Sequence, residues 1–169
     1  LKMFTVADNQ LMVEEKGIYS VEKFLVARRQ MYWQVYLHKT VLAAEKMLVH
    51  IIERAREIKA SCSSSTLNMF LNHSYNKQEM YERLFEFCQL DDYDVVSSVK
   101  EWMHHPDKVL ASLCKNILNR KLLKCKLQTA CFEETLVNQF RVKAAEALQI
   151  SVEEARYFVF TGQTQNTTY

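Results

Sequence analysis

Residues that interrupt helices are scarce in this chain of 169 residues. Glycine occurs only at Gly17 and Gly162, and proline occurs only at Pro106. Because glycine and proline mark many turns and helix ends, their absence from positions 18–105 favours long helices joined by short polar loops. The sequence therefore predicts a mainly α fold.

Apolar residues recur at close to the helical period along most of the chain. This spacing predicts one long amphipathic helix from about Val21 to about Lys59, with Ser20 as a partial N-cap. A loop is expected at Ser61–Ser65. Further helices are predicted at 67–73 and 77–89, from Asp91-Asp92 to the His104-His105-Pro106 stop, after a cap at Asp107, and at 133–149.

Patterns typical of strands occur only near the two ends of the sequence. Residues 1–13 are expected to form a short strand or hairpin arm that turns at residues 7–9. Apolar and polar residues alternate at 123–129, which predicts a strand, and Tyr157–Thr161 is predicted to form another. We therefore expect a helical domain at 1–121 and a small, incomplete α+β subdomain at 122–169. A capping box is expected between Ser151 and Glu154.

Composition argues against several classes of protein. The net charge is only +2, which gives no broad basic field for nucleic acid, so the lysines near 115–126 make nucleic acid the last-ranked partner. No apolar run approaches the roughly 20 residues that cross a bilayer, so no membrane partner is expected. The five cysteines are odd in number and never spaced as C-x-x-C, which favours reduced thiols and a cytoplasmic location.

One face of the predicted long helix carries an unusual set of side chains. Arg28, Tyr32 and Tyr36 are spaced four residues apart, and Lys39 follows three residues later. On a helix this spacing places all four on one face. Arginine offers a planar fork of donors to phosphate oxygens, lysine adds a positive charge, and tyrosine adds a ring and a hydroxyl. The pattern suits an anionic ligand that carries a ring. Ordinary surface cations beside tyrosines at the edge of a core give the same pattern.

Three segments of the chain resemble one known family. The string VEKFLVARRQMYWQVYLHK at 21–39 resembles the segment that follows the metal site in HD-domain phosphohydrolases, the dGTPase-like enzymes that cleave deoxynucleoside triphosphates. FCQLDDYD at 87–94 and LCKNILNRKLLK at 113–124 resemble the same family in the same order. The resemblance implies the C-terminal part of a helical HD-type phosphohydrolase body, followed by the small α+β subdomain.

The resemblance also implies roles for the residues on the helix face. Arg28 matches the family arginine that reaches the phosphates of the substrate. Tyr36 matches the tyrosine that packs against the deoxyribose, where a close ring disfavours a 2′-hydroxyl. Tyr32 occupies a position that can also face the substrate, and the family varies there.

A second set of residues matches positions that contact an effector nucleotide in regulated members of the family. His38 and Lys39 match a pair that does so at a subunit interface, and Lys16 falls near another basic effector-contacting position. The resemblance therefore implies deoxynucleoside triphosphates, an effector nucleotide and further copies of the chain as partners, in a homo-oligomer.

The metal motif that names the HD family is not visible in this sequence. The family holds a divalent metal through a His, an adjacent His-Asp pair and a distant Asp. In this chain no His is followed directly by Asp, and Pro106 interrupts the nearest imitation, His105 to Asp107. Helix capping explains Asp91 and Asp92. We therefore expect neither metal ligands nor catalytic residues in this chain, and place the divalent metal in a longer parent protein.

These observations predict the C-terminal portion of a metal-dependent deoxynucleoside triphosphate triphosphohydrolase, which releases a deoxynucleoside and triphosphate. The chain begins at Leu1 within a half-apolar segment, which favours a piece of a longer polypeptide that is inactive alone. The alternative is a non-enzymatic helical oligomerisation module, whose contact face would include Met31, Trp33, Met47 and Leu48. Arg28, Tyr32 and Tyr36 pointing into a shared cleft would favour the nucleotide enzyme. An exposed Arg28 beside buried tyrosines would favour the module.

Overall fold

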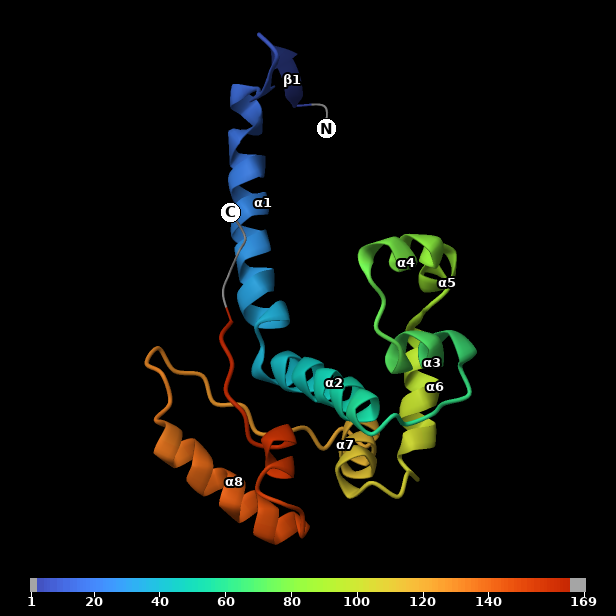
Figure 1. The fold of residues 1–169 in the computed structure, drawn as a ribbon. Coiled ribbons are helices and arrows are strands. Elements are labelled where there is room, and N and C mark those ends of the chain that lie inside the picture. Colours follow the sequence, from blue (N-terminus) through green and yellow to red (C-terminus); the bar gives the residue numbers. More distant parts are fainter. Residues whose placement is uncertain (1–2, 165–169) are drawn as a thin grey trace. The chain divides into compact units, whose positions relative to one another are not determined.

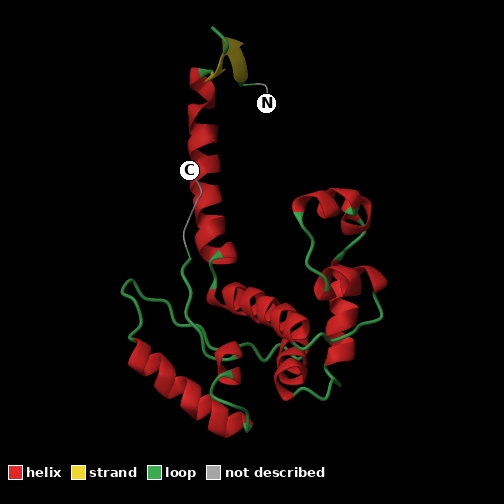
Figure 2. Cartoon of the chain, viewed as in Figure 1, coloured by secondary structure: helices red, strands yellow, loops and turns green. Residues whose placement is uncertain are grey.

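The structure is a computed structural model, and it describes residues 3–164. These residues form a mainly helical fold with a small antiparallel sheet, as predicted (Figure 1 and Figure 2). The chain divides into two compact units. Among the described residues, the first unit comprises 3–42 and 163–164, and the second unit is Ala43–Gly162. The predicted domain boundary after residue 121 stays a prediction.

The first unit begins with a hairpin. Strands β1 (Phe4–Ala7) and β2 (Gln10–Val13) pair antiparallel. Asp8 and Asn9 connect them at φ values of 51° and 62°, the left-handed region that tight hairpin turns require. The hairpin and its turn are therefore confirmed over the described part of the predicted segment 1–13, whose residues 1–2 lie outside the described range.

A buried glycine joins the hairpin to the first helix. The 3-10 turn η1 (Glu15–Gly17) ends at Gly17, directly before α1 (Ile18–Met31). A Cβ at Gly17 would lie 3.0 Å from atoms of both Met3 and Val13. The absence of a side chain at Gly17 therefore lets the hairpin pack closely against the start of α1.

The single helix predicted from Val21 to Lys59 is wrong. After α1, the π-helical turn η2 (Tyr32–Tyr36) interrupts the α-helix, and α2 (Lys39–Glu57) follows. The N–H of Leu37 donates to the carbonyl of Tyr32, five residues earlier, at 2.8 Å. Ser20 is not the N-cap, because α1 begins at Ile18 after Gly17. The helical period of apolar residues continues through this interruption, so the pattern could not reveal it.

The second unit contains most of the remaining helices, and they lie close to the predicted positions. The helix predicted at 77–89 is divided in two at Arg83. Asp91 and Asp107 cap the two following helices, as predicted, because each side chain accepts at least one hydrogen bond from an N–H group in the first turn. The elements are α3 (Ser65–Asn72), α4 (Lys77–Glu82), α5 (Leu84–Cys88), α6 (Asp92–Trp102), α7 (Lys108–Leu118), α8 (Glu134–Leu148) and the 3-10 turn η3 (Glu154–Tyr157).

The core of the second unit is built mainly from α2, α6 and α7. Ile51, Trp102 and Leu110 are almost completely buried in it. The indole N–H of Trp102 donates to the carbonyl of Ser61 at 2.8 Å, which satisfies the polar atom of this buried ring. Tyr157 also belongs to the core, so the C-terminal part of the unit packs on the helical body.

The two strands predicted after residue 121 are wrong. Residues 121–133 are irregular, and residues 154–157 form η3. Leu122 and Leu123 pack against the core, while much of the following segment is exposed. The alternation of apolar and polar residues in this segment therefore does not correspond to a strand paired in a sheet. The N–H of Val159 donates to the carbonyl of Ala155, so this segment folds locally. The small sheet of the described residues therefore lies at the N-terminal end.

Candidate functional site

Three predicted site residues form a continuous row in the first unit. The guanidinium carbon of Arg28 lies 5.5 Å from the centroid of the Tyr32 ring, a cation–π distance. The rings of Tyr32 and Tyr36 are 5.1 Å apart and tilted by 58°. The last turns of α1 carry Arg28, and the π-helical turn carries both tyrosines. The structure therefore brings these side chains together along one face.

The exposure of Arg28, Tyr32 and Tyr36 decides only in part between the nucleotide enzyme and the oligomerisation module. Arg28 is exposed, Tyr32 is half-buried and 51% of Tyr36 is exposed. The exposed arginine fits the oligomerisation module, but the tyrosines are not buried as that alternative requires. Within residues 3–164 no carboxylate forms an ion pair with Arg28, so its guanidinium keeps donors for a ligand anion.

The predicted effector-binding residues lie at opposite ends of α1. Lys16 precedes the helix and pairs with Glu14 at 2.5 Å. His38 and Lys39 follow the π-helical turn, and Nδ1 of His38 accepts a hydrogen bond from the N–H of Thr40 at 3.3 Å. The 14 residues of α1 and the five residues of η2 separate these two groups, and α1 alone is about 21 Å long at 1.5 Å per residue. Within one chain, Lys16 and Lys39 therefore cannot touch the same small ligand.

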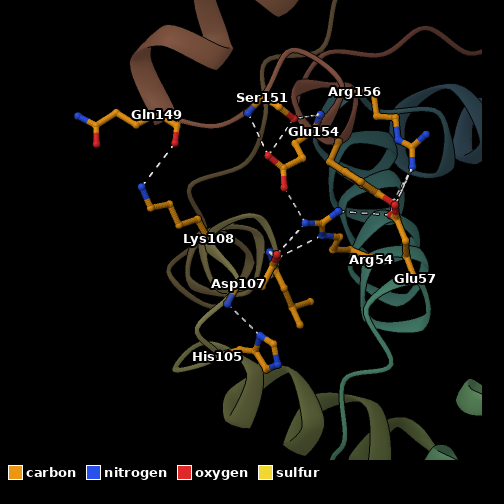
Figure 3. Close-up of polar contacts among 11 residues, drawn as sticks. Arg54, Glu57, His105, Asp107, Lys108, Gln149, Ser151, Glu154 and Arg156 are labelled. Carbon is orange, nitrogen blue, oxygen red and sulfur yellow. Dashed lines mark hydrogen bonds and ion pairs between the residues drawn. The ribbon is translucent and has the colours of Figure 1, made fainter.

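A second polar cluster, in the second unit, was not predicted from the sequence (Figure 3). Arg54 of α2 is 8% exposed. Its Nη2 and Nε donate to the two carboxylate oxygens of Asp107 at 2.7 and 3.2 Å. Nη2 also donates to Glu154 at 2.8 Å, and Nη1 lies 3.5 Å from Glu57. One guanidinium thus joins α2, the N-cap of α7 and η3.

The surrounding groups complete this Arg54 network. Arg156 donates to Glu57 at 3.3 Å (Figure 3). The hydroxyl of Tyr157 also donates to Glu57. Ser151 and Glu154 exchange the hydrogen bonds of the predicted capping box, at 3.0 and 3.1 Å between backbone N and side-chain oxygen. One signal in the sequence could have revealed the network: Arg54 continues the buried stripe of Met47 and Ile51 on α2, where an unpaired charge is costly.

The network stabilises the charged form of each of its carboxylates. The hydrogen bond from Tyr157, with help from Arg54 and Arg156, lowers the pKa of Glu57. Burial opposes ionisation of Asp107, but the bonds from Arg54 and from the N–H of Leu110 still lower its pKa. Hydrogen bonds from Ser151 lower the pKa of Glu154. In turn, the bond to Asp107 raises the pKa of Arg54, so the cation is retained.

The network suits a structural role. Arg54 already occupies carboxylate oxygens of Asp107, Glu154 and Glu57. Across the described range 3–164, no three His, Cys, Asp or Glu side chains are grouped so that they could hold a metal ion. The donor set of a divalent metal is therefore not offered by these residues.

Stability should fall in acid because of these carboxylates. Their pKa values are lower in the folded state, so their contribution is present above pH ~4.5 and lost as the pH falls through the folded-state values. We expect the urea midpoint to drop between about pH 4.5 and pH 2 and to drop less steeply in Arg54→Ala. Circular dichroism at each pH measures the midpoint. Equal slopes in the two proteins would contradict this role of Arg54.

Among the helices of the described residues, none is both long and apolar enough to span a bilayer.

The sequence of this chain is similar to one family model and to proteins of other organisms. Residues 1–76 match the family model described as the HD associated region. The chain is 29% identical over 124 residues to the uncharacterized protein YwfO of Bacillus subtilis, covering 73% of this chain and 28% of the relative. An uncharacterized protein of Mycoplasma genitalium is 29% identical over 150 residues, covering 80% of this chain and 35% of that protein.

A solved structure matches almost the whole chain. The crystal structure of a phosphohydrolase from Bacteroides thetaiotaomicron superposes with a TM-score of 0.92 at 40% identity, covering 98% of this chain. The chain spans only 43% of that protein. It spans 28% of the Bacillus subtilis relative and 35% of the Mycoplasma genitalium relative. Together, the family model and the solved structure support an HD-associated, phosphohydrolase-like family for this chain.

Proposed function

We propose that this chain is the C-terminal portion of a metal-dependent deoxynucleoside triphosphate triphosphohydrolase. The row of Arg28, Tyr32 and Tyr36 carries the proposal, because it offers a cation and two rings on one accessible face. The similarity to a phosphohydrolase supports the class of reaction. The longer protein would convert a deoxynucleoside triphosphate and water into a deoxynucleoside and triphosphate.

Each residue of the row has a separate role in this proposal. Arg28 binds phosphate oxygens through its planar donor fork. The ring of Tyr32 lies against that guanidinium and restricts its orientation. Tyr36 packs against the deoxyribose and leaves little room for a 2′-hydroxyl. The π-helical turn supports a functional role for this segment, because such turns inside helices occur frequently at functional sites.

Two parts of the proposed enzyme lie outside a single copy of this chain. The first is the divalent metal, which supplies charge stabilisation and an activated water when bound. The second is the effector site, because the whole of α1, 14 residues or about 21 Å at 1.5 Å each, and the five residues of η2 lie between Lys16 and Lys39. An effector nucleotide that contacts Lys16, His38 and Lys39 together therefore needs residues from two copies, which requires a homo-oligomer.

A product assay tests this function. The longer protein that contains this chain is incubated with a divalent metal and each deoxynucleoside or ribonucleoside triphosphate, with and without a second nucleotide. We expect deoxynucleoside and inorganic triphosphate from the deoxy substrates, with ribonucleotides disfavoured, and faster turnover when an effector is present. Chromatography and phosphorus NMR identify the products. Release of monophosphate or diphosphate products, or no turnover of any nucleotide, would contradict the proposal.

The oligomerisation module remains the second candidate. Exposed apolar side chains on the first unit favour it: Met31 is 50% exposed and Trp33 is 59% exposed. Met47, however, is fully buried in the core of the second unit, so it cannot belong to a contact face. The two candidates are separated by the product assay, because a module without nucleotide chemistry gives no turnover.

A further inference from the structure

An open cavity of about 660 Å³ lies on the second unit, and none of the residues that line it was predicted as a site residue. Three parts of the chain line it: α2, α8 and the segment from η3 to Phe160. The volume is within the range of about 300–1,000 Å³ that is usual for small-molecule sites. The lining residues are His50, Glu53, Arg56, Glu57, Arg141, Arg156, Tyr157 and Phe160.

The cavity gathers three arginines with unused donors. Arg141 donates from Nε to the carbonyl of Val159 at 3.0 Å and from Nη1 to Asn138 at 3.4 Å, which fixes its plane. Arg56 donates to the hydroxyl of Ser74 at 2.9 Å. Within residues 3–164, neither Arg56 nor Arg141 forms an ion pair with a carboxylate. Because a guanidinium has five N–H donors, both can still bind an anion.

The carboxylates of the cavity do not cancel this positive charge. Glu57 is already engaged by Arg54, Arg156 and Tyr157. Glu53 is exposed and lies 3.9 Å from Nε2 of His50. The carboxylate of Glu53, beside the arginines of the cavity, can accept hydrogen bonds from a sugar hydroxyl or a base N–H.

Aromatic rings form another wall of the cavity. The ring of His50 lies 4.2 Å from that of Phe160 and 5.7 Å from that of Tyr157, both in edge contacts. Nδ1 of His50 is 3.0 Å from the carbonyl of Tyr157. A carbonyl only accepts, so Nδ1 carries the hydrogen and the imidazole is held in place. These rings offer a planar ligand a surface beside the arginines.

We propose that this cavity is a second nucleotide site, which binds a nucleoside phosphate. Arg141 and Arg56 hold the phosphates, with Arg156 beside them, and the base lies against His50 and Phe160. All the residues belong to the second unit, whereas Arg28, Tyr32 and Tyr36 belong to the first. The proposal therefore stands without the proposed hydrolase function.

Calorimetric titration of the 169-residue chain tests the site. The row at Arg28 is also proposed to bind phosphate, so every titration uses the Arg28→Ala chain as background. The probes are dGTP, inorganic triphosphate and deoxyguanosine. We expect dGTP to bind at least 10-fold more tightly than either of the other two, because it alone engages both the arginines and the rings. Equal affinity for triphosphate and dGTP, or no binding of dGTP at millimolar concentration, would overturn the proposal.

Variants locate the binding. Arg141→Ala and Arg56→Ala should each weaken dGTP at least 10-fold, and Arg141→Lys should weaken it as well, because lysine keeps the charge without the planar fork. Lys143→Ala is the matched control, because Lys143 is an exposed cation on α8 that does not line the cavity. Circular dichroism checks that each variant is folded. If Arg141→Ala is unfolded, the location of the site is tested with Arg56→Ala and Arg141→Lys. Loss of binding in Lys143→Ala equal to that in Arg56→Ala would overturn the location.

Discussion

Arg28→Ala in the longer protein that contains this chain is expected to lower turnover of deoxynucleoside triphosphates by about 100- to 1,000-fold, the effect typical of losing one donor to a charged transition state. Arg28 is exposed, and within the described residues 3–164 no carboxylate pairs with it. Its donors are therefore available to the substrate. Steady-state kinetics with chromatographic detection of the deoxynucleoside measure the loss.

The neighbouring residue provides the control for this variant. Arg29 is also an exposed arginine in the last turn of α1, but of these two arginines only Arg28 lies at a cation–π distance from Tyr32, at 5.5 Å from the ring centroid. Arg29→Ala removes the same charge and should change turnover less than about threefold. An unchanged rate in Arg28→Ala, or equal losses in the two variants, would contradict the proposed phosphate contact.

Arg54→Ala is expected to lower the free energy of unfolding of the chain by about 3–5 kcal/mol, the usual cost of removing one partner from a buried ion pair. The side chain of Arg54 is 9% exposed, and it holds Asp107 at 2.7 Å and Glu154 at 2.8 Å. Its loss leaves these carboxylates close together without a cation and removes the link from α2 to Glu154, while the bonds from Arg156 and Tyr157 to Glu57 still join η3 to α2. Urea denaturation followed by circular dichroism measures the change.

Arg56→Ala is the matched control for stability. Arg56 is on the same helix, two residues further along, but it is exposed and donates to the hydroxyl of Ser74. Its replacement should change the free energy of unfolding by less than about 0.5 kcal/mol, as for most surface substitutions. A loss below about 1 kcal/mol in Arg54→Ala would show that the network contributes little to stability.

The alignment of Arg28, Tyr32 and Tyr36 could be predicted because it depends on short-range geometry. Residues four positions apart meet on one helix face whatever the rest of the chain does. The π-helical turn at Tyr32–Tyr36 was missed, because the apolar residues on either side of it recur at spacings that an uninterrupted α-helix also allows. The break at Leu37, and with it the exposure of Tyr36, therefore had to be seen in the structure.

The strand predicted at 123–129 shows where prediction from local sequence fails. Alternation at 123–129 predicts an extended chain, but a strand also needs a partner for its backbone groups. In the described residues that segment is irregular, and Leu122 and Leu123 pack on the helical core instead. The hairpin at β1 and β2 was predictable because Asp8 and Asn9 specify its turn locally.

Local physics in the sequence accounts for the helical class, the hairpin, the helix caps at Asp91 and Asp107 and the row at Arg28, since each depends on residues within a few positions of one another. The Arg54 network and the second-unit cavity depend instead on residues far apart in the chain, such as Arg54 and Glu154. No periodicity specifies which distant side chains will meet. Packing of α2, α7 and η3 around a shared core selects the partners of Arg54, because burying such a charge requires carboxylates to meet it there.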